Sequence, residues 1–496
     1  MTQSDSVNQS DPHPFTPRGE LNPAPHDRYN LVILGGGPAG MACATGAASL
    51  GARVALVERD ALGGNSLASG SVPSKALIRA SRTAAEVRRA AEFGIRLPGP
   101  PEVDFPAAME RLRAVQQQIS AKDDIETLLD KGVDVFMGEG SFLDPSHISV
   151  SGKTLNFSRA VIATGASPTP SGVPGLEQIP TLTYDTLFQL SGLPRRLAVI
   201  GAGPLGCELA QSFARFGSSV VVYERQPQIL AGEDSDAALI VQQALERDHV
   251  TFRLGCSELR AETVASGGSI HSQSGDHWFA DPCDLVLVAA GRMPNTAGLQ
   301  LDAAGVRTDK DGVIVNNFLR TTNSHVFAAG DCCSQYKFTH SAVALARIVI
   351  ANALFFGTDK VTSLLIPWCT FTDPECAHVG VQEQDVAGLH LNTMSVPVSD
   401  CDRFAIDGDS AGLFKIHYDI RGVIRGATIV SARASELIGE LVLVMNHNVR
   451  LAALASDILP YPTESEVLKR AGDLYHRSFV TPSMAKFLRK LLELRR

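Results

Sequence analysis

The sequence predicts an α/β protein that contains two Rossmann-like dinucleotide-binding domains. Two glycine-rich turns indicate this fold, because each turn follows a short apolar strand and opens a helix. A second strand follows each helix and ends in a glutamate eighteen residues after the last glycine of the turn. The length of 496 residues agrees with this fold, because at roughly 100–200 residues per domain three folded units are expected.

The chain begins with a segment that is not expected to fold. Residues 1–27 are rich in Asn, Asp, Ser and Pro and contain no apolar run, which predicts a disordered leader rather than a signal peptide. A cytoplasmic location is the default expectation. The net charge of -9 offers no basic surface for nucleic acid. Residues 342–356 are the most apolar stretch, but Arg347 interrupts them, so a buried helix is expected there rather than a membrane span.

The first glycine-rich turn follows a predicted strand at residues 29–34. Gly35 permits the tight turn, Gly37 lets the backbone approach a pyrophosphate, and Gly40 lets the helix pack closely on the strand. The N-terminus of that helix then faces the phosphates with its partial positive charge. Glu58 ends the next strand, where it can accept hydrogen bonds from a ribose.

The same pattern recurs after a predicted strand at residues 196–200. Gly201, Gly203 and Gly206 repeat the turn, and Glu224 ends the strand that follows the helix. A single glycine fingerprint is weak evidence, but two complete copies in the correct context are strong. The two copies predict two bound dinucleotides, one held permanently and one that exchanges.

Residues 63–75, GGNSLASGSVPSK, identify the family that the chain resembles. They resemble the active-site segment of the flavin-dependent pyridine nucleotide-disulfide oxidoreductases, in which two cysteines separated by four residues lie against the flavin. Here Ser66 and Ser71 stand at the two cysteine positions, and Gly64 falls in the cofactor-binding part of the segment. A hydroxyl cannot form a disulfide. The resemblance therefore implies an intact flavin site that lacks the redox disulfide through which electrons usually leave the flavin. This holds whether the two serines are natural or engineered.

Further segments extend the resemblance from about residue 28 to the C-terminus. Thr164 and Gly165 match the crossing between the FAD and nicotinamide domains, Gly291 lies where the chain returns, and Asp331 matches the acid that binds FAD. The resemblance implies an FAD domain, an NAD(P) domain inserted into it and a C-terminal α+β dimerisation domain. The expected limits are 28–165 and 293–364 for the FAD domain, 166–292 for the NAD(P) domain, and 365–496 for the dimerisation domain.

Two residues are expected beside the flavin because the family places a lysine and a glutamate there. Lys75 and Glu208 occupy the matching positions, and a cation beside the flavin would stabilise negative charge on its reduced form. A buried structural ion pair is the alternative. Glu224 favours NADH, because a carboxylate repels the 2′-phosphate of NADPH. Arg225 keeps NADPH open as an alternative.

The C-terminal segment resembles the family motif in which a His is the acid-base group for thiol substrates and a Glu orients it across the dimer interface. Tyr461 replaces that His, while Glu466 remains. An unperturbed tyrosine has a pKa near ~10 and is poorly placed for proton transfer at pH 7, which argues against glutathione or lipoamide chemistry. Interface packing is the other interpretation of Tyr461.

The cysteines do not form a pattern typical of zinc sites, and reduced thiols are expected. The vicinal pair Cys332-Cys333 follows Asp331, and two small buried hydrophobes are the favoured interpretation. Reduction of mercuric ion needs soft thiolates, and the C-terminal Cys pair of mercuric reductases is absent. The nine cysteines are Cys43, Cys207, Cys256, Cys283, Cys332, Cys333, Cys369, Cys376 and Cys401.

A last helix is expected at about residues 482–496, with Met484, Phe487, Leu488 and Leu491 on one face. Packing in the dimer is the favoured role, and contact with a membrane surface is the alternative.

The sequence as a whole predicts a homodimeric FAD enzyme that takes electrons from NADH. Reduced flavin would pass them directly to a small-molecule acceptor, such as a quinone or a second nicotinamide. Soluble transhydrogenases, which resemble the family yet lack an intact Cys pair, offer a precedent. A mercuric reductase-like or dihydrolipoamide dehydrogenase-like enzyme and a non-catalytic flavin- and NADH-binding protein are the alternatives.

Overall fold

The computed structural model describes residues 22–122, 124–265, 267–409 and 411–496. Most of the expected leader lies outside these residues, but its last six residues contact the first domain. The Asn22 side chain donates a hydrogen bond to the carbonyl of Met137 at 2.9 Å and accepts one from its N–H at 2.8 Å. The ammonium group of Lys153 binds the carbonyl oxygens of Asn22 and Pro23. Residues 22–27 therefore belong to the folded domain, and the expected disordered leader does not extend over them.

The first domain is built on a seven-stranded sheet in which β3, β2, β1, β6 and β19 run parallel. Strand β6 is long enough to pair also with β5, which pairs with β4, both antiparallel. The predicted first strand is β1, and five of its six residues are buried, as expected of a central parallel strand. The strands are β1 (Tyr29–Leu34), β2 (Val54–Glu58), β3 (Val133–Met137), β4 (Gly140–Asp144), β5 (His147–Val150), β6 (Lys153–Ile162) and β19 (Val326–Ala328).

Helices α1 and α9 pack against each other on this sheet, although about 300 residues of chain separate them. The apolar stretch expected to form a buried helix is α9, with eight of its sixteen residues buried. The chain therefore returns to the first domain after the second. The helices of this domain are α1 (Pro38–Ser49), α2 (Gly64–Ala68), α3 (Ser71–Arg88), η1 (Ala90–Phe93), α4 (Phe105–Ser120), α5 (Ile125–Asp130) and α9 (Thr339–Leu354).

The second domain has a five-stranded parallel sheet in the order β11-β10-β9-β15-β8 and an antiparallel three-stranded sheet. The antiparallel pair β7 and β16 lies where the chain enters and leaves it. The strands are β7 (Ala166–Pro168), β8 (Thr181–Thr183), β9 (Arg196–Ile200), β10 (Ser219–Tyr223), β11 (Val250–Arg253), β12 (Cys256–Val264), β13 (Gly267–Ser274), β14 (His277–Cys283), β15 (Leu285–Val288) and β16 (Arg292–Pro294). The helices are η2 (Leu176–Gln178), α6 (Tyr184–Leu187), α7 (Pro204–Phe216) and α8 (Ser235–Arg247). The short strands β17 (Thr308–Asp309) and β18 (Gly312–Val313) come after the chain has returned to the first domain.

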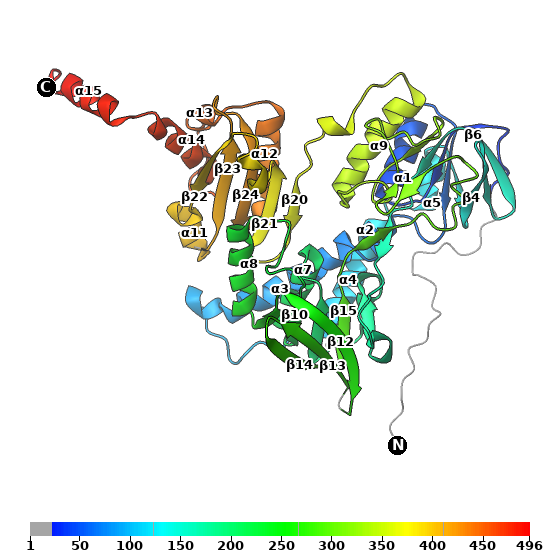
Figure 1. Ribbon diagram of the computed structural model, residues 1–496, viewed down its shortest axis with the longest axis horizontal. Helices are drawn as coiled ribbons and strands as arrows, with labels where there is room; N and C mark the ends of the chain where they lie inside the picture. The colour runs from blue at the N-terminus through cyan, green and yellow to red at the C-terminus, as the bar shows by residue number, and fades with distance from the viewer. Residues whose placement is uncertain (1–21, 123, 266, 410) are drawn as a thin grey trace.

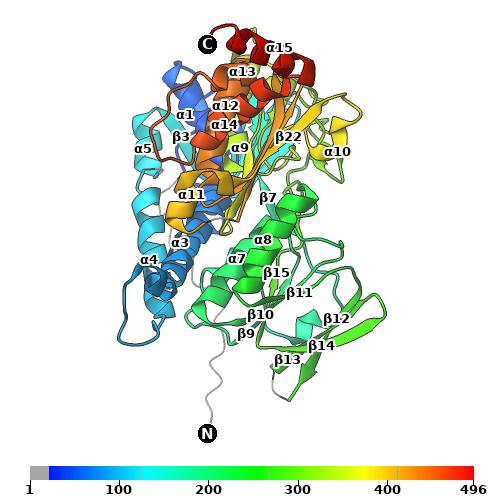
Figure 2. The same ribbon diagram turned by 90° about the vertical axis from the view of Figure 1, so that its left-hand side faces the viewer.

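The C-terminal domain is an antiparallel sheet, in the order β20-β21-β24-β23-β22, covered by helices. In Figure 1 the C-terminal domain and the first domain form two lobes above the second domain. Figure 2 shows α15 at the end of the C-terminal domain that lies farthest from the second domain. The strands of the C-terminal domain are β20 (Trp368–Thr370), β21 (Glu375–Gly380), β22 (Asn392–Val396), β23 (Leu413–Tyr418) and β24 (Ile424–Ser431). The short helix η3 (Val361–Ser363) precedes this domain and packs on the core of the first domain. The helices of the C-terminal domain are α10 (Glu383–Val386), η4 (Val398–Asp400), α11 (Asp402–Asp407), α12 (Ala434–Asn446), α13 (Leu451–Leu454), α14 (Glu466–Ser478) and α15 (Pro482–Glu493).

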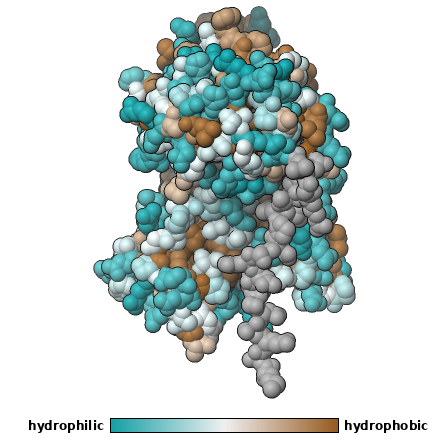
Figure 3. Space-filling view, turned by 90° about the vertical axis from the view of Figure 1, so that its right-hand side faces the viewer, coloured by the Kyte–Doolittle hydropathy of each residue, from teal (hydrophilic) through white to brown (hydrophobic). Residues whose placement is uncertain are grey.

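The surface is mostly hydrophilic on the face that Figure 3 shows, with hydrophobic residues scattered or in small groups. Such scattered groups are normal for a folded protein. Among the described residues, no helix combines the length and the apolar character that a membrane crossing requires.

Candidate active site

One large cavity of about 1980 Å³ is lined by both glycine-rich turns. Glu58 and Glu224, which end the strands after those turns, also line it. Typical pockets for a single small ligand measure about 300–1,000 Å³. The cavity is therefore large enough for two dinucleotides.

The first turn has the backbone that its glycines were expected to provide. Gly35 has a φ of +105°, and a Cβ on it would overlap the carbonyl oxygen of Ala163. A Cβ on Gly40 would overlap the carbonyl oxygen of Gly35. On Gly37, by contrast, the nearest atom to a Cβ would be the Cα of Gly64, at 3.9 Å. Gly37 thus leaves space over the start of α1, where a pyrophosphate would bind.

The second turn repeats this arrangement. Gly201 also has a φ of +105°, and a Cβ on Gly206 would overlap the carbonyl oxygen of Gly201. Nothing lies within 4 Å of a Cβ built on Gly203, so this backbone is open to the cavity. The start of α7 therefore has the same shape as the start of α1.

The two glutamates also occupy equivalent positions. Glu58 accepts hydrogen bonds from the N–H groups of Gly36 at 2.6 Å and Asp60 at 2.7 Å, and burial raises the pKa of Glu58. Glu224 accepts from the N–H of Ala202 at 2.8 Å and from that of Gln226 at 3.0 Å. An ionised carboxylate has about four acceptor sites, so each keeps capacity for ribose hydroxyls. The residues present therefore fit two dinucleotides.

The crossing between the two domains is fixed by paired polar groups. Thr164 donates its hydroxyl to the carbonyl of Asn295 at 2.6 Å, and the Asn295 amide donates to the carbonyl of Thr164 at 2.9 Å. Gly165 and Gly291 line the cavity beside them with φ angles of +69° and +116°. Asn295 had no expected role, because a sequence gives no sign of a contact with a residue 131 positions away.

Asp331 lies in the wall of the cavity and forms an ion pair with Arg292 at 2.7 Å. Burial raises the pKa of Asp331, while the positive charge of Arg292 opposes the rise. The Arg292 guanidinium also donates to the hydroxyl of Tyr184 at 3.2 Å. Sequence reasoning assigned no role to Arg292 or Tyr184, although Arg292 directly follows the expected site residue Gly291.

Lys75 and Glu208 are brought together. The ammonium of Lys75 on α3 lies 2.8 Å from Glu208 on α7, whose side chain is only 3% exposed. The other Glu208 oxygen accepts a hydrogen bond from the N–H of Phe371 at 2.8 Å. The ammonium also lies 4.5 Å from the centre of the Phe371 ring. One cation at the cavity wall is thus held by groups from all three domains.

Ser66 and Ser71 meet at one hydroxyl that the sequence did not assign. The Ser66 and Ser71 oxygens lie 2.9 Å and 3.3 Å from the hydroxyl oxygen of Thr339, the first residue of α9. All three residues line the large cavity. Ser66 and Thr339 also line a second cavity of about 350 Å³. Its other lining residues are Pro38, Met41, Ala42, Thr45, Gly63, Leu67, Val72, Ile119, Lys122, Thr127, Leu128, Lys131 and Val343.

Tyr461 and Glu466 do not line either cavity within one chain. Tyr461 is 71% exposed and donates its hydroxyl to Asp402 at 2.7 Å, and this hydrogen bond raises the pKa of Tyr461. Glu466 pairs with Arg470 at 3.1 Å. A role for them at this cavity would have to come from a second subunit.

All nine cysteines lie in the described residues and are free thiols. Cys332 is buried, and its sulfur approaches the carbonyl oxygens of Ile162 at 3.3 Å and Ala329 at 3.4 Å. Its neighbour Cys333 is half-buried and does not line either cavity. These contacts agree with a packing role for the vicinal pair, which stays a prediction.

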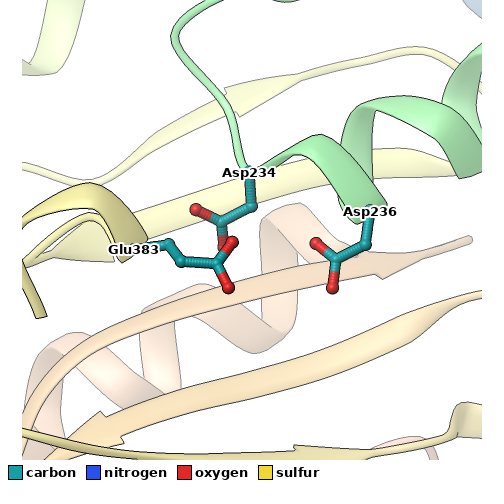
Figure 4. Close-up of side chains that lie close together, drawn as sticks. All are labelled: Asp234, Asp236 and Glu383. Atoms are coloured by element: carbon teal, nitrogen blue, oxygen red, sulfur yellow. The ribbon is translucent and has the colours of Figure 1, made fainter. Parts of the chain in front are cut away.

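Three carboxylates converge away from the cavity, as Figure 4 shows: Asp234, Asp236 and Glu383. The ammonium of Lys415 lies 3.3 Å, 2.7 Å and 3.0 Å from them, respectively. The Lys415 side chain is 2% exposed. Its charge offsets part of the negative charge of the three carboxylates, and the cluster is an ionic link between the second and C-terminal domains.

The chain is similar to known proteins over nearly its whole length. Residues 29–346 match the family described as pyridine nucleotide-disulphide oxidoreductase, and residues 366–472 match the dimerisation domain of that family. The chain is 31% identical to a mercuric reductase from Staphylococcus aureus over 90% of this chain and 82% of that protein. It is 32% identical to a dihydrolipoyl dehydrogenase from Thermus scotoductus over 91% of this chain and 98% of the relative.

Two solved structures have the same fold. The HOCl-induced flavoprotein disulfide reductase RclA from Escherichia coli matches with a TM-score of 0.79 and 26% identity, over 90% of this chain and 100% of that one. LpdA from Mycobacterium tuberculosis matches with a TM-score of 0.80 and 27% identity, over 90% and 99% of the two chains.

Proposed function

Because the chain belongs to the pyridine nucleotide-disulphide oxidoreductase family, whose members bind FAD and NAD(P)H, we propose that it is an NADH-dependent flavoenzyme that needs no redox disulfide. Reduced flavin would pass electrons directly to a small-molecule acceptor. The hydroxyl cluster of Ser66, Ser71 and Thr339 carries this proposal. Two of these residues, Ser66 and Ser71, stand where the family is expected to have its cysteines. A hydroxyl cannot accept electrons as a disulfide does.

The two dinucleotides are assigned by the turns. We place FAD on the first turn with Asp331, and NADH on the second turn with Glu224. Glu224 keeps acceptor capacity for the 2′ and 3′ hydroxyls of the ribose, and its charge opposes a 2′-phosphate. Arg225 is exposed at the rim of the same cavity, which keeps NADPH as the alternative.

The bound pair of cofactors would supply hydride transfer and a two-electron carrier. Lys75 would supply a fixed positive charge at the cavity wall, because Glu208 and the Phe371 N–H leave it little freedom. Binding of dinucleotides would exclude water from this wall and strengthen the effect of that charge.

The hydroxyl cluster can bind an oxygen atom of the acceptor. The three hydroxyls offer three O–H donors, and their two mutual contacts use two of them. One O–H therefore remains free to donate a hydrogen bond to the acceptor. The second cavity shares Ser66 and Thr339 with the large one, and its walls mix apolar side chains with polar ones, including two lysines, Lys122 and Lys131. Its volume of about 350 Å³ is that of a small-ligand pocket. A flat acceptor with carbonyl oxygens suits both these mixed walls and the free O–H donor, which favours a quinone.

The names of the relatives suggest mercuric ion or lipoamide as a second class of acceptor. Such acceptors need thiolates. Cys256 and Cys369 line the large cavity, but burial raises the pKa of the Cys369 thiol well above its usual value. A protonated thiol is a poor ligand and nucleophile. This alternative is therefore disfavoured.

Anaerobic rapid mixing of the FAD-loaded protein with NADH tests the proposal. Loss of the flavin absorbance band, followed by its return when a benzoquinone is added, is expected. Failure of NADH to bleach the band would instead support a non-catalytic binding protein. Robust turnover of oxidised glutathione, lipoamide or mercuric ion would show that electrons leave through sulfur and would contradict the proposal.

The variant Thr339→Val tests the hydroxyl cluster. It removes the oxygen that both serines contact, and losing one hydrogen bond of about 1 kcal/mol should slow quinone turnover about fivefold. Reduction of the flavin by NADH should stay unchanged. Thr83→Val on α3 is the matched control, because its hydroxyl binds only the carbonyl of Arg79 on the helix surface.

A further inference from the structure

Helix α15 lies beyond the part of the chain that matches the family. The dimerisation match ends at residue 472, while α15 spans Pro482–Glu493. Thr481 caps it by accepting a hydrogen bond from the N–H of Met484 at 3.2 Å. No residue of α15 is buried, and in Figure 1 the helix projects past α14, away from the other domains. The chain thus forms a capped helix that is not buried by any other element among the described residues.

One face of this helix is apolar and exposed. Met484, Phe487, Leu488 and Leu491 are spaced at i, i+3, i+4 and i+7, which places them on one side. They are 48%, 61%, 40% and 40% exposed. Leu492 widens the face and is 60% exposed. A continuous apolar face of this kind is not the scattered surface hydrophobicity of an ordinary monomer.

The opposite face is basic. Lys486, Arg489 and Lys490 follow the same spacing on the other side, and Glu493 is the one acid between residues 482 and 496. Five basic residues fall in this range, although the whole chain has a net charge of -9. Among the described residues, the basic side chains of α15 form no ion pair with a carboxylate. Their charge is therefore available to an external anion.

We propose that α15 binds the surface of an anionic lipid bilayer and lies parallel to it. The apolar face would enter the boundary between headgroups and acyl chains, and the basic face would contact lipid phosphates. A basic polar face opposite a Phe- and Leu-rich face is typical of interfacial helices. Anionic headgroups complement the local positive charge.

A second copy of the chain is the competing occupant, and it fits less well. The match to the family's dimerisation domain ends at residue 472, ten residues before α15 begins. A lipid surface can engage both faces of the helix, because the apolar face enters the membrane while the lysines and the arginine on the opposite face contact headgroups. The proposal is independent of the acceptor, because α15 does not line either cavity.

Vesicle sedimentation of the full-length, FAD-loaded protein tests the proposal. The protein should sediment with vesicles of phosphatidylserine and phosphatidylcholine, and should stay in the supernatant with phosphatidylcholine alone. The double variant Phe487→Glu/Leu491→Glu should weaken the anionic binding at least tenfold. The triple variant Lys486→Gln/Arg489→Gln/Lys490→Gln should weaken it similarly and remove its sensitivity to salt.

Leu239→Glu is the matched control, because Leu239 is a 50% exposed leucine on α8 of the second domain. It should leave vesicle binding unchanged, and circular dichroism with flavin absorbance confirms that each variant is folded. Equal binding by the double variant would overturn the proposal. The proposal would also be overturned if the protein failed to bind vesicles and if light scattering showed that altering α15 dissociates the dimer. In that case α15 would contact a second copy of the chain.

Discussion

Replacing Gly203 by alanine is expected to weaken NADH binding without harming the fold. Gly203 has a φ of -71°, which alanine adopts freely, and no atom lies within 4 Å of the added Cβ. The free energy of unfolding should therefore change by less than about 1 kcal/mol. The new methyl would occupy the space through which the backbone approaches a pyrophosphate. Overpacking costs about 1–3 kcal/mol, so NADH should bind roughly 5- to 150-fold more weakly.

The assay is a titration with NADH that follows flavin fluorescence, with FAD content and thermal unfolding measured on the same sample. FAD content should stay at the wild-type level, because FAD is assigned to the first turn. Gly206→Ala is the contrasting variant, since its Cβ would overlap the carbonyl oxygen of Gly201 and destabilise the domain itself. Unchanged NADH affinity in a folded Gly203→Ala protein would show that NADH does not lie on this turn.

Two further predictions concern ionisable side chains outside the cavity. Burial raises the pKa of Glu233 to about 7, although its hydrogen bond from the indole of Trp368 at 2.6 Å opposes the rise. The folded state then holds a proton that the unfolded state loses near pH 4.5, so the free energy of unfolding should fall as pH rises from about 4.5 to 7, by at most about 3 kcal/mol. Glu233→Gln should flatten this slope in urea unfolding at pH 5 and 7.5, whereas the exposed Glu246→Gln should not; a slope kept by Glu233→Gln would contradict the assignment. Lys415→Met should destabilise the protein by about 3–5 kcal/mol at pH 7, because three carboxylates would lose their shared cation. Urea unfolding of the variant at pH 7 measures this loss, and a loss below about 1 kcal/mol would contradict the expectation.

The sequence predicted the two dinucleotide-binding modules well because their signals are local. Strands at 29–34 and 196–200 have the expected limits, since apolar runs before glycine turns leave few alternatives. The error over residues 22–27 has the opposite cause. Their composition is that of a disordered segment, but Asn22 binds the backbone of β3, and such a contact cannot be recognised from composition.

The candidate site was predictable only where a motif carried it. Lys75 and Glu208 were paired through a resemblance, because 133 residues separate them and no spacing rule connects them. Sequence reasoning assigned no role to Thr339 or Arg292, because their contacts with Ser66 and Asp331 depend on how the domains pack. Tertiary contacts of this kind decide which polar residues of a motif face the cavity.

The short segment from Phe371 to Glu375 explains why the C-terminal domain matters to the cavity of its own chain. The Phe371 N–H binds Glu208, and the buried guanidinium of Arg215 on α7 pairs with Asp373 at 2.8 Å. Arg82 on α3 pairs with Glu375 at 2.9 Å. Buried ion pairs add little net stability, because desolvation offsets their attraction, but they fix geometry. The two helices that carry Lys75 and Glu208 are therefore both tied to the first strands of the C-terminal domain. Because the ammonium of Lys75 can act only at a fixed position, docking of this domain is part of what builds the electrostatics of the site.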